Sequence, residues 1–481
     1  MVSSQPLTNS SESTQTGQIP DMRSPNQQLM PLTAKVNELD HLEVGGCDVK
    51  QLVEQFGSPL YILDEQTVRA ACQQYRDSFK RYYPSESLVI YASKAWNCLA
   101  MCALIKSEGI GIDVVSGGEL FTALTAGIDP SKIYLHGNNK AEEELALAIA
   151  TGCTVIADNW YELELLAKLV KEQAQHPLIS EEELPEGVSI CNQPARVMIR
   201  ITPGIECHTH EYIQTGHLDS KFGFDPNQMG EVLDFAQAHP EIQWIGLHAH
   251  IGSQIFEVEP HRDLTAVLID WFITASDKGL PMEEVNVGGG LGIRYTESDD
   301  PPSIEDWSKV VCDGIIKACD ERQLNYPKLI CEPGRSLVGS SCVTAYTVGA
   351  KKVVPETRTY LSVDGGMSDN PRPITYQSLY SIVLANRMSA PVTEVATIAG
   401  KHCESGDILI KDAQIPECSV GDHLVVLATG AYNYSMSSNY NRIPRPAAVL
   451  VNDGQANLIL QRETYRDLIR HDRIPARLQL A

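Results

Sequence analysis

The chain has 481 residues, 43% of them hydrophobic, and its 62 acidic and 38 basic residues give a formal net charge of −24. This length exceeds one ordinary core, and the charge argues against nucleic acid or an anionic membrane as a partner. No apolar run approaches the roughly 20 residues of a membrane span. The thirteen cysteines form no CxxC pair and the N-terminus lacks a signal-peptide pattern, so we expect a cytoplasmic protein of two domains.

The first part of the chain is polar. Residues 1–38 are rich in Ser, Thr, Gln, Asn and Pro and are predicted to form a disordered tail, because they contain too few large apolar groups to fold alone. Residues 39–62 form a lead-in segment that we expect to join a C-terminal β-domain. A second polar stretch, residues 171–195, predicts a surface insert.

Residues 63–340 alternate β-rich runs with amphipathic, helix-like stretches, as in βα units around a parallel sheet. Eight such units over about 250 residues are typical of a (β/α)8 barrel. Residues 341–481 change to β-rich runs and turns, which predicts a mainly antiparallel β-domain. The eight predicted barrel strands are residues 88–92, 110–115, 132–136, 154–158, 197–201, 244–251, 284–288 and 328–332.

Polar residues follow these strands, at the end of the barrel where such folds place their active sites. Lys94 follows the apolar run 88–92, where a lysine either extends its charge into solvent or takes part in chemistry. The glycines of "NVGGGLGI" do not form a dinucleotide loop, because GxGxxG would need glycine where Ile293 stands. They form either a phosphate-binding loop or a tight turn. The other strand-end residues are Asp113, Ser116, His136, Asn138, Asp158, Arg200, His250 and Ser253.

Glu332 ends the eighth strand and has two interpretations. It either forms a structural salt bridge with Arg335, or it contacts a protonated ring nitrogen and leaves Arg335 for an anion. The His-x-His patterns in "GLHAHIGSQ" and "CHTHEY" keep a metal-dependent hydrolase open as an alternative. A lysine, a glycine loop, a carboxylate and a histidine for a ring face are together what pyridoxal phosphate chemistry requires.

Eleven motifs occur in order between about residues 45 and 470: YASKA, DVVSGGEL, HGNNK, TGHLDSKFGF, GLHAHIGSQI, NVGGGLGI, CEPGR, DGGMSDNPRPITY, CESGD, GAYNYSMSSNYN and QRETYRDL. With them the chain resembles the alanine-racemase-like (fold type III) pyridoxal-phosphate decarboxylases, and within them the diaminopimelate decarboxylases. The resemblance implies decarboxylation of meso-2,6-diaminopimelate to L-lysine and CO2, the last step of lysine biosynthesis, with pyridoxal 5'-phosphate and no metal. An ornithine/arginine-type decarboxylase and a non-catalytic regulator on the same fold are the alternatives.

The resemblance also implies roles for individual residues. Lys94 would carry the cofactor as a Schiff base, with Glu332 at the pyridinium nitrogen and His250 against the ring face. Cys403 would be the proton donor, and it and Glu404 would come from the other subunit of a homodimer. The further cofactor contacts would be Ser253, Gly289, Gly290, Gly334, Arg335 and Tyr432, and the substrate contacts Arg335, Arg372, Tyr376, Glu404 and Tyr432.

One residue departs from this pattern. The family's usual lysine motif continues Lys-Ala-Asn, whereas here Trp96 stands between Ala95 and Asn97. We expect its ring to pack beside the cofactor or in the barrel wall rather than to take part in catalysis.

Overall fold

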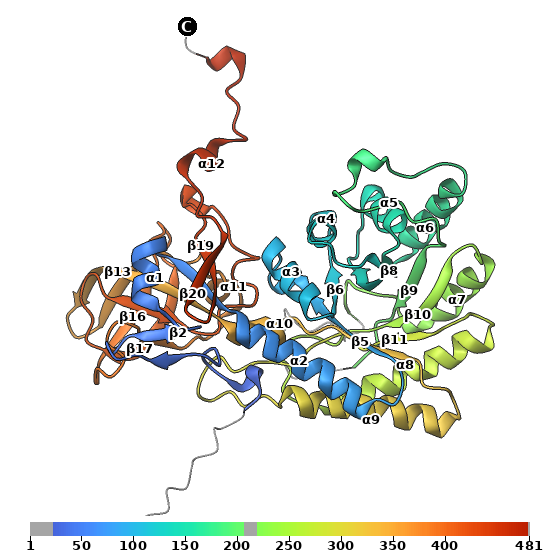
Figure 1. The fold of residues 1–481 in the computed structure, drawn as a ribbon, viewed down its shortest axis with the longest axis horizontal. Helices are drawn as coiled ribbons and strands as arrows, with labels where there is room; N and C mark the ends of the chain where they lie inside the picture. Colours follow the sequence, from blue (N-terminus) through green and yellow to red (C-terminus); the bar gives the residue numbers. More distant parts are fainter. Residues whose placement is uncertain (1–22, 206–218, 480–481) are drawn as a thin grey trace, which may run out of the picture.

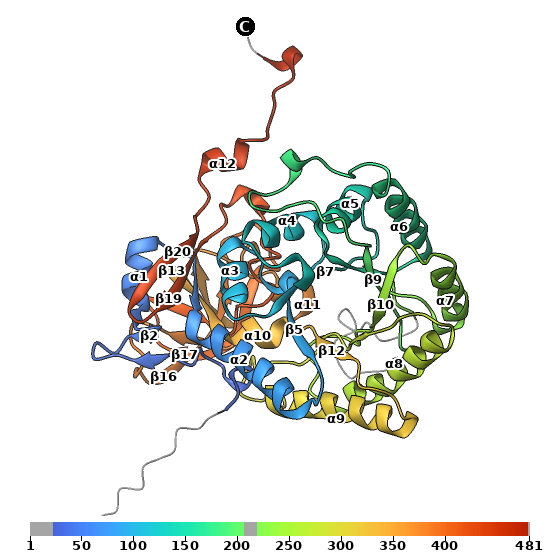
Figure 2. The same ribbon diagram turned by 45° about the vertical axis from the view of Figure 1, so that its right-hand side comes forward.

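The computed structural model describes residues 23–205 and 219–479, which form a barrel and a β-domain (Figures 1 and 2). Eight parallel strands close the barrel in chain order, so the predicted fold class is confirmed. Each strand begins within one residue of a predicted one and ends within two, except β10, which ends three residues earlier than predicted. The strands are β5 (Ser87–Ala92), β6 (Gly111–Val114), β7 (Ile133–Leu135), β8 (Thr154–Ala157), β9 (Arg196–Arg200), β10 (Gln243–His248), β11 (Glu284–Asn286) and β12 (Lys328–Cys331).

Helices surround the barrel and begin at polar capping residues. Asp64, Ser116, Asn159 and Ser303 each accept a hydrogen bond from a backbone N–H in the first turn of the helix that follows. The helices of this layer are α2 (Glu65–Tyr82), α3 (Leu99–Ser107), α4 (Gly117–Thr125), α5 (Glu142–Thr151), α6 (Trp160–Gln173), α7 (Met229–Ala238), α8 (Glu259–Asp277) and α9 (Ile304–Arg322).

The interior of the barrel is packed with side chains. A cluster of buried residues from six strands fills its middle, and Glu284 closes the amino-terminal end with ion pairs to Arg196 at 2.9 Å and Lys328 at 2.8 Å. Because the middle of the barrel is filled, the carboxyl ends of the strands, where barrels of this type carry their active sites, are the place to look for a ligand site. The cluster consists of Ile90, Tyr134, Ile156, Met198, Ile245 and Ile330.

The β-domain contains a sheet in the order β17-β16-β14-β13-β4-β19-β20. Strand β4 (Leu60–Asp64) lies between β13 and β19, antiparallel to the first and parallel to the second, so a segment that precedes the barrel completes this sheet. The other strands are β13 (Cys342–Val354), β14 (Arg358–Val363), β15 (Ile382–Leu384), β16 (Val392–Ala399), β17 (Ile408–Pro416), β18 (His423–Val426), β19 (Ala447–Asn452) and β20 (Gln455–Leu460).

Short elements complete the fold. Strands β1 (Lys35–Val36), β2 (Leu42–Val44) and β3 (Cys47–Asp48) form a small sheet beside helix α1 (Val49–Phe56). Helices α10 (Arg335–Val338), α11 (Arg372–Tyr376) and α12 (Tyr465–Ile469) lie in the C-terminal part. No described helix combines the length and hydropathy that a membrane crossing requires.

The predicted disordered tail needs a correction from residue 23 onward; residues 1–22 lie outside the described residues. Residues 25–27 form a 3-10 helix, and Asn26 is fully buried. Its Nδ2 donates hydrogen bonds to the carbonyl oxygens of Gly292 (3.1 Å) and Pro302 (2.9 Å). The segment is ordered because its polar groups are hydrogen-bonded to the barrel, which composition does not reveal.

Candidate active site

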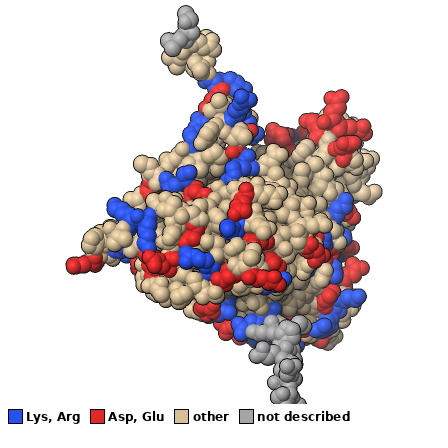
Figure 3. Space-filling model, turned by 60° about the vertical axis from the view of Figure 1, so that its left-hand side comes forward, with Lys and Arg blue, Asp and Glu red and all other residues tan. Residues whose placement is uncertain are grey.

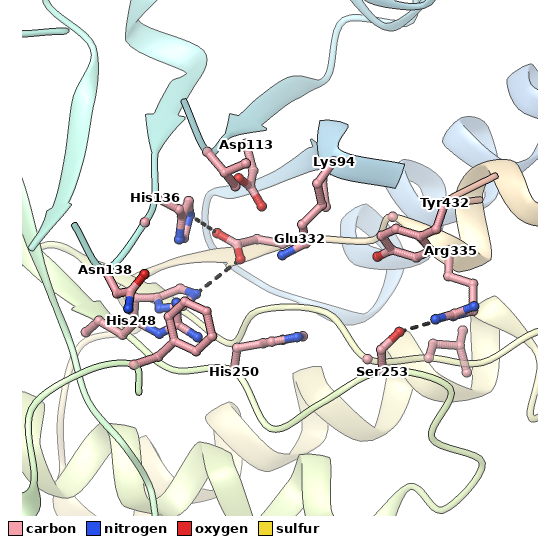
Figure 4. A pocket seen from close by; sticks show the side chains of 18 of the residues that line it. Lys94, Asp113, His136, Asn138, His248, His250, Ser253, Glu332, Arg335 and Tyr432 are labelled. Carbon is pink, nitrogen blue, oxygen red and sulfur yellow. Dashed lines mark hydrogen bonds and ion pairs between the residues drawn. The ribbon is translucent and has the colours of Figure 1, made fainter. Parts of the chain in front are cut away.

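A cavity of about 390 Å³ opens at the carboxyl ends of the barrel strands (Figure 4). Barrel strands and their loops provide one wall, and helix α11 and the loop around Tyr432 provide the other. The predicted site residues that line it are Lys94, His250, Ser253, Gly290, Glu332, Gly334, Arg335, Arg372, Tyr376 and Tyr432. Residues from six segments of the chain are thus brought to one place.

Lys94 lies in a short 3-10 turn, Ser93–Ala95, directly after β5. Its side chain points into the cavity toward Glu332 (Figure 4). Burial would lower the pKa of the Lys94 amine, but the negative charges of Asp113 and Glu332 outweigh it and raise the pKa above its ordinary value. The backbone of the turn is held by the β-domain, since the carbonyl of Ala95 accepts hydrogen bonds from the Tyr432 N–H (2.8 Å) and the Ser435 hydroxyl (3.1 Å).

Trp96 does not line the cavity. Its fully buried ring stacks on Tyr434, with centroids 5.3 Å apart, and meets the edge of Tyr61 at 5.5 Å. These partners come from β4 and from the loop after β18, so Trp96 packs between the barrel and the β-domain and not beside the cofactor site. The residue that departs from the family pattern thus helps to join the two parts of the chain next to Lys94.

Glu332 is in close contact with three side-chain nitrogen atoms at the centre of the cavity. His136 Nε2 lies 2.9 Å and Asn286 Nδ2 2.7 Å from Oε1, and His248 Nε2 lies 3.1 Å from Oε2 (Figure 4). Burial alone would raise the pKa of the Glu332 carboxyl, but His136 and His248 hold it well below its ordinary value. Glu332 is therefore an ionised, fixed acceptor.

The salt-bridge interpretation of Glu332 is wrong. Among the described residues the Glu332 carboxylate contacts the two histidines and Asn286 but no arginine, whereas Arg335 Nε donates to Ser253 Oγ (3.1 Å) and Nη1 to the Tyr295 hydroxyl (2.6 Å). Arg335 carries no carboxylate partner among these contacts, so its charge is available to an anion.

His250 presents a neutral ring. Its Nδ1 accepts a hydrogen bond from the Gly289 N–H at 3.2 Å. Burial, together with the nearby positive charges of Lys94 and Arg200, holds the pKa of His250 well below its ordinary value. An uncharged, flat side chain at the cavity wall suits stacking on an aromatic ligand.

Further residues face the cavity without having been assigned a site role from the sequence, among them His136, His248 and Asp113. The sequence did contain a signal for each of them, because His136 and Asp113 lie at predicted strand ends and His248 belongs to a His-x-His pattern. Burial lowers the pKa of His248 to about 3, so this ring is neutral when it donates to Glu332. Asp113 is buried, its carboxylate oxygens have no hydrogen-bond partner, and burial raises its pKa. Such a group can meet a polar ligand atom.

The metal-site alternative has a geometric counterpart. Ligand atoms of His136, His248 and Glu332 lie within 4.8 Å of one another, a spacing that a metal ion could bridge. The same atoms contact each other directly in the structure, as described above for Glu332. The second pattern, with His208 and His210, lies outside the described residues.

The cavity fits pyridoxal phosphate in its donor set. It offers an amine, an ionised carboxylate, a neutral ring and an arginine, and the glycine loop after β11 brings backbone close to it. Gly290 has φ +126°, and a Cβ there would lie 2.8 Å from His261 Cε1 and 3.2 Å from the Gly252 carbonyl oxygen. Only glycine allows the loop to pass this close to its neighbours.

Cys403 and Glu404 lie elsewhere. They occupy an exposed turn between β16 and β17, and neither is among the residues that line the cavity. The Cys403 N–H donates to Asn441 Oδ1 at 2.9 Å. A single chain therefore does not bring these two predicted residues to the site.

Comparison with known proteins agrees with this chemistry. Residues 65–339 match the family model "Pyridoxal-dependent decarboxylase, pyridoxal binding domain". Diaminopimelate decarboxylase of Synechocystis sp. is 62% identical over 95% of this chain and 96% of its own length, and that of Bacillus subtilis is 44% identical over 92% and 97%. The structure of diaminopimelate decarboxylase from M. jannaschii with L-lysine superimposes with a TM-score of 0.84 at 33% identity, covering 94% of this chain and 100% of the other.

All of these relatives are decarboxylases, which favours that activity over the metal hydrolase and the non-catalytic regulator. The family and the cofactor expected from the sequence motifs are confirmed. The chain belongs to the diaminopimelate decarboxylase family of pyridoxal-dependent enzymes.

Proposed function

We propose that the cavity at the carboxyl end of the barrel binds pyridoxal 5'-phosphate and decarboxylates meso-2,6-diaminopimelate to L-lysine and CO2. The reaction follows from the family; the observation that supports the site is the convergence of Lys94, Glu332, His250 and Arg335 on one cavity. When bound, the cofactor supplies an electron sink for the carbanion that loss of CO2 leaves.

The residues around Glu332 support its role at the ring nitrogen. A carboxylate held ionised by His136, His248 and Asn286 can keep a proton on a neighbouring nitrogen atom, as the electron sink requires. Lys94 provides the amine for covalent attachment and is released when the substrate amine replaces it. Neutral His250 covers one face of the cofactor ring and does not compete for the proton on the ring nitrogen.

The phosphate and the substrate need cationic and backbone donors. We assign the phosphate to the loops that carry Ser253, Gly289, Gly290 and Gly334, next to the Arg335 side chain. Arg372 is buried at the cavity wall, and its guanidinium carbon lies 5.2 Å from the ring centroid of Tyr376 and 5.7 Å from that of Tyr432. An arginine in this setting suits a substrate carboxylate, which an ordinary amino acid lacks at its far end.

We infer that Cys403 and Glu404 reach the cavity from a second copy of the chain in a homodimer. Both are exposed, whereas a proton donor and a contact for the distal amino group must touch the substrate. We also infer a cytoplasmic location, supported by the free thiols of every described cysteine.

Two inactive variants test the shared site. Lys94→Ala and Cys403→Ala are each expected to lose lysine formation, and mixing them under exchanging conditions should restore about a quarter of the wild-type activity, since half of the dimers are mixed and each mixed dimer has one intact site. Mixing Lys94→Ala with Glu332→Gln is the control, because both lesions lie in one chain's cavity and leave a mixed dimer with no intact site. Equal recovery in both mixtures, or none in either, would argue against a shared site.

Product identification tests the substrate. Lysine and CO2 are expected from diaminopimelate, with no comparable turnover of ornithine or arginine. Faster turnover of ornithine or arginine would assign the chain to a different decarboxylase specificity.

A further inference from the structure

The last residues of the chain leave the body of the molecule as a projecting arm, defined here as residues 464–479. In Figures 1 and 2 it extends from the end of the β-domain, away from both the barrel and the sheet. All of its residues are exposed except Leu468, which is half-buried. The arm is nevertheless locally ordered, since the Asp467 carboxylate accepts hydrogen bonds from the Thr464 N–H and hydroxyl, both at 2.7 Å.

The composition of the arm is that of an interface element. Tyr465, Ile469, Ile474 and Leu478 each have 59–79% of their surface exposed. A five-residue helix such as α12 is not stable in water without tertiary contacts, and large apolar side chains that project together are typical of a surface that another protein covers. The described structure gives this arm no such cover within its own chain.

The base of the arm is tied to the segment that carries Cys403. Arg442 donates from Nη1 to the Leu468 carbonyl oxygen (2.5 Å) and from Nη2 to the Asp472 carboxylate (2.9 Å). The preceding residue, Asn441, accepts from the Cys403 N–H. Asn441 and Arg442 both have φ +56°, a left-handed conformation that persists only where the surroundings require it. One short loop thus holds both Cys403 and the arm.

We propose that the arm is a dimerisation strap, which docks on a second copy of this chain and holds the Cys403 segment of one copy against the cavity of the other. The proposal rests on the shared site proposed above. A second copy is favoured because the strap is anchored in the loop that holds Cys403, the residue that the partner's cavity requires.

Charge supports the same occupant. Residues 464–479 contain four arginines and two aspartates, in a chain with a formal net charge of −24. Figure 3 shows basic side chains along the neck of the projecting segment. A basic, apolar arm is complementary to the acidic surface of another copy, and attraction of this kind aids encounter and register.

Truncation tests the strap. A chain that ends at Glu463 keeps the contacts of Glu463 with Arg445 and Asn439 and removes only the arm. We expect its dimer dissociation constant, measured by sedimentation, to rise at least ten-fold. Its activity should fall at low protein concentration and return at high concentration, because the cavity itself is unchanged.

A point variant within the arm tests whether an effect of truncation is specific to the contacts of the arm. Ile474 and Val420 are both 67% exposed, so neither substitution by serine should disturb the folded monomer. Ile474→Ser is expected to weaken the dimer, and Val420→Ser, at a turn outside the arm, to leave it unchanged. A truncated chain with an unaltered dimer constant would overturn the strap.

The two proposals fail in different ways. If complementation between Lys94→Ala and Cys403→Ala succeeds but truncation has no effect on the dimer, the strap is wrong and the shared site stands. If truncation weakens the dimer while complementation fails, the shared site is wrong and the arm still joins two copies.

Discussion

Replacing Gly289 by alanine tests how closely the glycine loop must approach Glu332. An added Cβ would lie 2.3 Å from the backbone oxygen of Glu332 and 3.1 Å from its carbonyl carbon. Real Cβ atoms essentially never come nearer than 3.0 Å, so the two backbones must separate by about 0.7 Å. Because the obstacle is backbone, no side-chain rotation relieves it.

We expect two consequences of Gly289→Ala. Overpacking of this kind costs about 1–3 kcal/mol of stability. A backbone displacement of about 0.7 Å at Glu332, the carboxylate proposed to contact the cofactor, should lower kcat by about 10- to 100-fold, since misplacement by 1 Å can cost about 10²-fold. The measurements are denaturant unfolding, cofactor titration by absorbance and CO2 release from diaminopimelate.

Gly230→Ala is the matched control. A Cβ at Gly230, in helix α7, meets nothing within 4 Å. Alanine in a helix is favoured over glycine by about 0.5–1 kcal/mol, so this variant should be as active as the wild type and no less stable. A Gly289→Ala enzyme with wild-type stability and kcat would refute the close-approach argument.

Three further predictions concern buried polar and aromatic groups. Lys140 Nζ lies 2.6 Å from Glu162 Oε1, and both side chains are buried. Lys140→Met leaves the Glu162 charge buried without its partner and should therefore lower the free energy of unfolding by about 3–5 kcal/mol, measured by denaturant titration. Adding Glu162→Gln removes that charge and should restore part of the loss. Burial raises the pKa of Asp369 from 3.8 to about 7, so its carboxyl binds a proton more tightly in the folded protein than in the unfolded chain. The stability that this group contributes is fully present below pH 3.8 and is lost as the pH rises through 7. Relative to Asp369→Asn, the free energy of unfolding of the wild type should therefore fall by up to about 4 kcal/mol between pH 4 and 8. Parallel profiles of unfolding free energy against pH for the two proteins would contradict this. Trp96→Ala should lower the free energy of unfolding by about 3–5 kcal/mol, and Trp96→Phe should lower it less, because only the alanine removes the aromatic contact with Tyr434. Thermal and denaturant unfolding measure both losses, and equal losses would count against that contact.

The barrel and the centre of its site could be predicted from local pattern. A strand buried on both faces is apolar along its length, as in residues 88–92, and this signal does not depend on its neighbours. Since parallel strands of a closed barrel all end at one rim, Lys94 and Glu332 had to meet once the eight strands were recognised. The motif resemblance then distinguished their chemistry.

Contacts between distant segments could not be predicted in this way. Composition assigned Asn26 to a disordered tail, yet its amide is hydrogen-bonded to Gly292 and Pro302, more than 260 residues later in the chain. For Glu332 the structure excludes the expected pair with Arg335, and no pattern in the sequence indicated that His136 and His248 contact its carboxylate.

The sequence by itself therefore determined the strands, the helices and the residues at their ends, because apolar periodicity is a property of neighbours along the chain. Only the tertiary structure decided the partners of those residues. Trp96 packs on Tyr434 because the β-domain closes over the first barrel turn, whereas Cys403, in a turn of the same β-domain, is not among the residues that line the cavity. Such pairings depend on how distant segments meet in space, and no local pattern records that.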